Sequence, residues 1–213
     1  MCLSHVEQAQ ATAVPPERLR ALQRASERPP HPGRSRPAWQ QRPLLVRVAG
    51  NFFYETPVVF RLGSVTCIGF TRDEHHNLRL DLRMPTTSGQ KRARITESFW
   101  EVPPLGADLA CPSSGHLIDI TYPDGDRFRA EFTDVHNGRA LQVRFGNVAR
   151  WAYRVRFPVT LVEITMMVAN TDLSFSPEDT CMGGPTTVGC FTSHGRGAID
   201  IPMDYDQLVG LFP

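Results

Sequence analysis

Cysteine and histidine side chains near the end of the chain provide the clearest candidate for metal chemistry. Cys181, Cys190 and His194 lie in a glycine-rich stretch, and zinc in proteins favours thiolate and imidazole ligands in tetrahedral sets. The spacing matches no C-x-x-C pattern, so a fourth ligand would have to come from Cys67 or Cys111. The alternative is that these cysteines are buried and pack as small apolar side chains. The zinc site is therefore a hypothesis about three residues.

Two further groups have residue types suited to nucleophilic or acid–base chemistry. Cys111 and His116 bracket the stretch CPSSGH, but a thiol nucleophile needs a base within hydrogen-bond reach and a third group that orients the base. His75 and His76 are adjacent, and adjacent side chains of an extended segment point to opposite faces. The chain contains no phosphate-binding glycine loop, zincin motif or catalytic-triad signature. The sequence therefore favours a non-catalytic protein, and we expect no cofactor.

Aromatic side chains are numerous enough to line a cavity as well as a core. The candidates for contact with a small apolar ligand are Phe53, Tyr54, Trp100, Trp151 and Tyr153. An eight-stranded barrel has room for one small ligand, and residues 44–213 suit a barrel of that size. Both a filled and a hollow interior fit this pattern.

Arginines on the expected outer faces of strands suggest a different partner. They are Arg79, Arg83, Arg92, Arg94, Arg127 and Arg129. Together with Trp100 and a basic N-terminal tail they would form a nucleic-acid surface, in which arginine contacts and aromatic stacking combine. Acidic residues on or beside the same strands support a simpler interpretation, alternating charge on a solvated sheet. These are Asp81, Glu97, Asp119 and Glu131.

The stretch from His116 to Asp134 predicts the hairpin around which the other elements are arranged. Two alternating runs flank Pro123, Asp124 and Gly125, and this trio fits a three-residue loop with a bulge at the glycine. The register that matches apolar with apolar and acid with base pairs Tyr122 with Asp126, Ile120 with Phe128, Asp119 with Arg129 and Ile118 with Ala130. A slip of one residue would turn every side chain to the wrong face.

Most of the chain after residue 43 shows the same period of two. It is clearest in Asn77–Met84, where leucines alternate with charged residues. Further strands are expected at Lys91–Trp100 and Leu141–Phe145, and Trp151–Asn170 should form two strands or one bent edge strand. Its second part, Thr160–Val168, is the most apolar run and is expected near the centre. We expect about nine to eleven short strands and no long helix. This pattern predicts an all-β fold, an antiparallel sandwich or a closed barrel.

Residues 1–43 differ from the rest of the chain and predict a disordered basic tail. They hold seven prolines, seven arginines and three glutamates, whereas residues 44–213 hold sixteen basic and nineteen acidic residues. Such a segment cannot bury enough apolar surface to offset its conformational entropy. A short helix is expected at 17–28. The remainder, residues 44–213, is expected to form a single all-β domain.

The composition bears on where the protein is located and on which classes of function fit it. No apolar run approaches the ~20 residues of a membrane-spanning helix, no conventional secretory signal is evident, and five cysteines are an odd number. We therefore expect a cytoplasmic protein without a membrane span. The leading hypothesis is a non-catalytic β-module that binds another protein. The first alternative is a β-barrel that binds a small apolar ligand, or a substrate on which it acts as an enzyme. The second is a nucleic-acid binder that uses the arginine-rich sheet face and tail.

Overall fold

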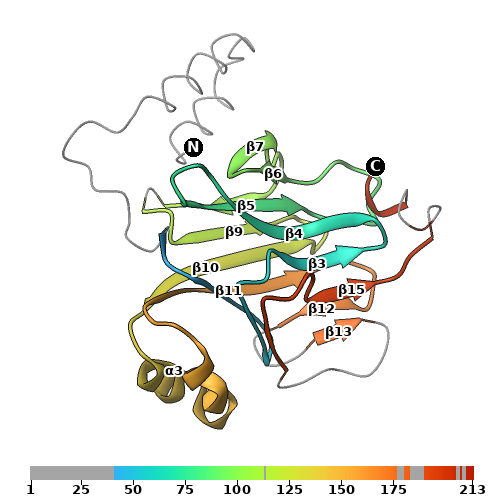
Figure 1. Cartoon of the computed structure of the whole chain (residues 1–213). Helices are drawn as coiled ribbons and strands as arrows, with labels where there is room; N and C mark the ends of the chain where they lie inside the picture. Colours follow the sequence, from blue (N-terminus) through green and yellow to red (C-terminus); the bar gives the residue numbers. More distant parts are fainter. Residues whose placement is uncertain (1–40, 113, 177–179, 183–189, 205–206, 208–209) are drawn as a thin grey trace, which may run out of the picture.

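The computed structural model describes residues 41–112, 114–176, 180–182, 190–204, 207 and 210–213, without the side chains of 147–150, 180 and 182. Within this part of the chain the strands form two sheets (Figure 1). The larger sheet has the order β14 (Phe191–Ser193), β2 (Asn51–Tyr54), β1 (Leu44–Val48), β11 (Val159–Met167), β10 (Arg127–Val135), β9 (Leu117–Thr121), β8 (Asp108–Ala110), with β12 (Leu173–Phe175) on β11 and β13 (Thr180–Met182) on β12. The smaller sheet has the order β15 (Ile199–Ile201), β3 (Val58–Leu62), β4 (Val65–Arg72), β5 (Leu78–Arg83), β6 (Arg94–Thr96), β7 (Phe99–Val102).

The two sheets face each other across one apolar core. Strand β5 shows why they do so, because its three leucines are buried while the charged residues between them are only partly buried. The ring of Phe60 on β3 meets the ring of Phe175 on β12 edge-on, with centroids 5.0 Å apart. An all-β fold was predicted, and the described residues are mostly β-structure with one α-helix.

The closed barrel and the purely antiparallel sheet are wrong. In the described chain each sheet ends in edge strands, β14 and β8 in one and β15 and β7 in the other. Three pairs are parallel: β1 with β11, β14 with β2 and β15 with β3. The paired strands in each case are far apart in sequence, so no tight turn constrains their relative direction.

The predicted hairpin between β9 and β10 is confirmed in its register. Ile120 pairs with Phe128, Asp119 with Arg129 and Ile118 with Ala130. Gly125 has φ +100°, the conformation for which glycine was expected. As expected, β11 lies inside its sheet, between β1 and β10.

Three predicted strands differ from the structure. Lys91–Trp100 contains a reversal, because Glu97 and Ser98 adopt positive φ and separate β6 from β7. Leu141–Phe145 lies in a helix, α3 (Gly138–Phe145), and Trp151 lies in the following 3₁₀ segment η2 (Gly146–Arg154), so the strand begins only at Val159. In α3 the alternation of Leu141, Val143 and Phe145 mimicked a strand.

A buried charge network joins the two sheets and corrects the outward placement of Arg92, whose side chain is 4% exposed. Its Nε donates to Asp126 Oδ2 at 2.8 Å, and Thr86 Oγ1 donates to the same oxygen at 2.6 Å. The Ala169 N–H donates to Asp126 Oδ1 at 2.8 Å. The guanidinium also lies 4.1 Å from the ring centroid of Tyr122. The hairpin loop of one sheet is thus tied to the β5–β6 connection of the other.

Residues 1–40, which include most of the predicted tail and its helix at 17–28, lie outside the described residues. Among the described helices, none combines the length and apolar character needed to cross a membrane.

Candidate anion-binding surface

Residues 136–158, which connect β10 to β11, contain α3 and η2, and we call this segment the helical excursion. Asn137 caps α3, with its side-chain oxygen accepting a hydrogen bond from the Ala140 N–H at 3.0 Å. Gly138 allows close packing, because a Cβ there would lie 3.3 Å from Ala152 Cβ and 3.6 Å from the Phe157 ring. The pair Asn137–Gly138 therefore starts the helix α3.

One side of this excursion is apolar and packs on the outer face of the larger sheet. Leu141 is fully buried there, in a cluster that includes Phe52 of β2 and Trp151. The rings of Phe52 and Trp151 are 4.6 Å apart, and Trp151 stacks on Phe191 of β14 at 4.3 Å. Figure 1 shows α3 below β10 and β11, away from β4 and β5. These contacts hold the excursion against the sheet.

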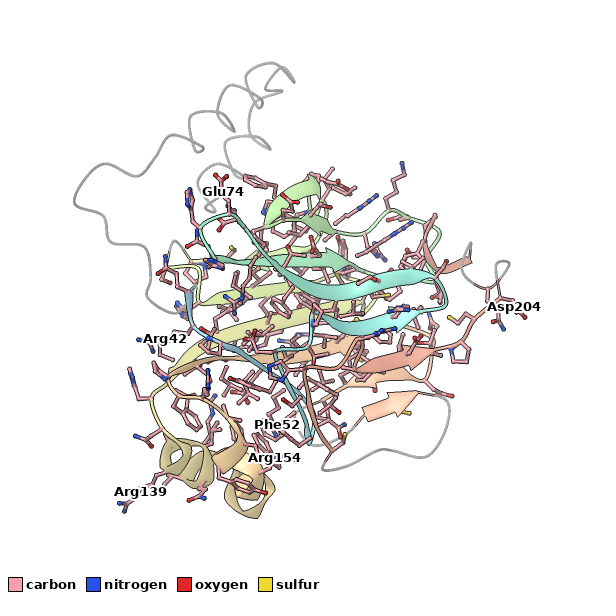
Figure 2. The ribbon with its side chains drawn as sticks, in the orientation of Figure 1. Arg42, Phe52, Glu74, Arg139, Arg154 and Asp204 are labelled. Atoms are coloured by element: carbon pink, nitrogen blue, oxygen red, sulfur yellow. The ribbon has the colours of Figure 1, made fainter. Side chains whose placement is uncertain are left out.

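The other side of the excursion is exposed and basic. We call its exposed arginines and tyrosine the arginine surface: Arg139, Arg144, Arg154, Arg156 and Tyr153. Tyr153 is 85% exposed. Figure 2 places Arg139 and Arg154 on the helical excursion, with Arg139 extending away from the sheets. Arginine guanidinium groups bind phosphate and carboxylate with paired hydrogen bonds, so this surface has donors for an anionic partner.

Few negative charges compensate the arginine surface. The chain has no acidic residue between Asp134 and Glu163, although it has five arginines there. Arg144 pairs with Glu163, and Arg154 lies 5.6 Å from the ring centroid of Phe191. In the described part of the chain, Arg139, Arg154 and Arg156 make no ion pair. The positive potential of the excursion therefore extends into solvent.

The arginines singled out in the sequence do not gather on one face. Arg79, Arg83 and Arg94 belong to the smaller sheet, and Arg127 and Arg129 to the larger. Most of them are neutralised by neighbouring carboxylates: Arg79 with Asp73 at 2.8 Å, Arg94 with Glu101 at 2.6 Å, and Arg127 and Arg129 with Asp119 at 3.0 and 2.9 Å. Burial alone would raise the pKa of Asp119, but the hydrogen bonds from Arg127 and Arg129 lower it below its usual value.

The five predicted ligand-binding aromatics are divided among four environments. Phe53 faces the core between the sheets, whereas Tyr54 and Trp151 lie in the cluster beneath the helical excursion. Tyr153 is exposed on the excursion, and Trp100 is partly buried on β7, an edge strand. The structure thus brings only Tyr54 and Trp151 together, and the predicted binding of an apolar ligand stays a prediction.

The predicted zinc ligands lie near one edge of the larger sheet. Cys181 is on β13, Cys190 directly precedes β14, and His194 directly follows it, with its Nδ1 2.7 Å from Ser193 Oγ. No three His, Cys, Asp or Glu side chains among the described residues are grouped so as to hold a metal ion. The four described cysteines are free thiols. The structure therefore does not bring Cys181, Cys190 and His194 together as a ligand set.

The sequence did contain a signal for the arginine surface. Counting charges in a moving window shows the acid-free stretch between Asp134 and Glu163 without any structure. A strand at Leu141–Phe145 would place alternate residues inside a sheet, whereas the structure exposes Arg139, Arg144, Arg154 and Arg156. Comparison of the chain with protein-family models, curated proteins and solved structures finds no match.

Proposed function

We propose that the protein is a non-catalytic module, with a β-sandwich as its scaffold, that binds single-stranded nucleic acid through the arginine surface. The observation that carries this proposal is the exposure of four arginines and a tyrosine on a segment without acidic residues. Arginines contact backbone phosphates, and an exposed aromatic ring offers a stacking platform for a base.

The distribution of charge supports the same proposal. Residues 44–213 carry more acidic than basic residues, yet the excursion between Asp134 and Glu163 carries only basic ones. A polyanion is therefore attracted more strongly to the excursion than to the rest of residues 44–213, whose net charge is negative. Such asymmetry orients an approaching nucleic acid and raises its association rate.

An acidic protein partner is the second candidate, and it keeps the hypothesis of a protein-binding module. Val143 on α3 is 81% exposed and Tyr153 is 85% exposed. Exposed apolar and aromatic side chains among arginines are also typical of the centre of a protein interface.

Fluorescence anisotropy with a labelled single-stranded RNA of about 20 nucleotides tests the proposal. If four arginines each contact a phosphate, the slope of log K against log salt should be about −3 for the unaltered protein, and about −1 for the triple variant R139Q/R154Q/R156Q. The matched control R61Q/R127Q/R129Q removes the same charge from strands, and it should leave the slope near −3.

A triple variant that binds the RNA as tightly and with the same slope as the unaltered protein would overturn the proposal. Binding to polyglutamate but not to RNA, lost in the triple variant, would replace it by the acidic-protein candidate. Binding to neither probe would overturn both.

A further inference from the structure

A second cationic site lies on the smaller sheet, remote in sequence from the arginine surface. A cavity of about 260 Å³ is lined by Arg83, Lys91, Arg92, Arg94 and Phe212 among others. A larger depression of about 490 Å³ on the outer face of the same sheet shares Arg83 and Arg94 with it. The lining of the smaller cavity includes four cationic side chains and no carboxylate side chain.

The pairing of β5 with β6 places two of these cations directly opposite each other. Arg83 of β5 is the cross-strand partner of Arg94 of β6. Like charges in directly opposed positions destabilise a sheet. Departures of this kind from stabilising local patterns are typical of functional sites. An anion between the two strands would reverse the sign of this interaction.

Neighbouring carboxylates compensate only part of the charge. Arg94 Nε lies 2.6 Å from Glu101 Oε2, and Arg92 is buried against Asp126 and Asp124. Arg83 and Lys91 make no ion pair with any carboxylate that the structure describes. The lining also includes Pro213, the last residue of the sequence, whose α-carboxylate adds one negative charge. The cavity therefore retains a net positive charge, and Arg83 and Lys91 both have donors available.

Arg83 is also held in place before any ligand arrives. Its guanidinium lies 4.7 Å from the ring centroid of Phe212, and the Thr86 N–H donates to the Leu211 carbonyl oxygen at 3.0 Å, which holds the segment that carries this ring. A guanidinium stacked on an aromatic ring loses less conformational entropy on binding. Arg83 is therefore the central residue of the site.

We infer that this cavity binds the oxyanion of a small polar molecule, with Arg83 and Lys91 contacting the anion and the larger depression receiving the rest of the molecule. Ser64, Thr66, Thr71, Thr96 and Asp81, whose side chains carry hydroxyl and carboxylate groups, are among the residues that line that depression. Such groups hydrogen-bond to the hydroxyls of a ligand. The ligand class is thus a hydroxylated phosphate or carboxylate, such as a sugar phosphate or a sugar acid.

Isothermal titration calorimetry of the full chain with inorganic phosphate, glucose 6-phosphate and gluconate tests the inference. Glucose 6-phosphate or gluconate should bind more tightly than inorganic phosphate, because only they extend into the larger depression. A phosphate ligand and a carboxylate ligand are distinguished by which of the two binds more tightly. R83Q should weaken binding about tenfold or more, since it removes a charge-assisted contact, and K91Q should weaken it less.

The control R61Q changes an arginine on β3 that pairs with Asp200 across 3.6 Å, and it should bind like the unaltered protein. R83K should bind the ligand more tightly than R83Q. This partial recovery would show that the loss of affinity in R83Q does not come from misfolding. Equal affinity of R83Q and the unaltered protein, or no heat with any ligand at about 10 mM, would overturn the inference. The substitutions in R139Q/R154Q/R156Q lie outside this cavity. Loss of RNA binding in that variant therefore tests the proposed function alone, and binding of the small anions by the unaltered protein tests this inference alone.

Discussion

Replacing Asp126 by asparagine should destabilise the protein by about 3 kcal/mol or more. The carboxylate is fully buried and accepts from Arg92 and Thr86 on one oxygen and from the Ala169 N–H on the other. An asparagine amide would turn its NH₂ group toward at least one of these donors. The buried guanidinium would keep only Asp124, whose side chain is 37% exposed, as a carboxylate partner.

The magnitude follows from the cost of leaving a buried charge without its partner. Removing one partner of a buried pair typically costs about 3–5 kcal/mol, and the remaining contact with Asp124 favours the lower end. Replacing both charges, in R92M/D126L, should cost much less than the sum of the single variants, because no unpaired charge remains. D200N, at an exposed pair with Arg61, should cost at most about 1 kcal/mol.

Urea unfolding followed by tryptophan fluorescence measures these differences, provided that the m value is unchanged. A D126N variant within about 1 kcal/mol of the unaltered protein would refute the assignment of this network as the tie between the two sheets. Additive effects of R92M and D126L would refute the coupling between the two charges.

Further measurements test local features. Burial would raise the pKa of Asp73, but hydrogen bonds from Asn77, Arg79 and the His75 N–H hold this pKa well below its usual value. The Asp73 carboxylate therefore stabilises the fold above the unfolded-state pKa of about 4, and this contribution is lost as the pH falls below that value. D73N should accordingly make the free energy of unfolding less dependent on pH in the acid range. Burial raises the pKa of Cys67 to about 12, so a thiol reagent at about pH 8 should label Cys67 only after unfolding, while the partly exposed Cys190 reacts in the native protein. N137A should cost about 1 kcal/mol in urea unfolding by removing the cap of α3, and N137D should cost less. G125A should cost about 1–2 kcal/mol in a thermal melt because alanine is strained at φ +100°. Unchanged stability of D73N at acid pH, of N137A or of G125A, or labelling of Cys67 in the native protein, would contradict the corresponding contact.

The elements predicted correctly are those whose signal lies within a few residues. The β9–β10 register follows from matching faces on either side of a short loop, and β5 follows from its alternating leucines. Both patterns depend on neighbours along one strand or across one turn. Local chemistry was sufficient for them.

The helix α3 was predicted as a strand because its apolar residues recur at every second position. Leu141, Val143 and Phe145 alternate, but Leu141 is fully buried while Val143 is 81% exposed. In the fold, burial is determined by which side packs on the outer face of the larger sheet. The cap at Asn137 and the fit of Gly138 against Ala152, which support the helix, are contacts of the tertiary structure.

The sequence by itself determined the alternation of apolar side chains, the hairpin at Gly125 and the absence of acid between Asp134 and Glu163. Only the tertiary structure decided that β1 lies parallel to β11, that Arg92 is buried against Asp126, and that Arg83 faces Arg94 beside Phe212. The physical reason is the distance along the chain over which each interaction acts. Side-chain periodicity acts over a few residues, whereas strand partners and buried charge pairs depend on which distant segments meet when the two apolar faces leave water.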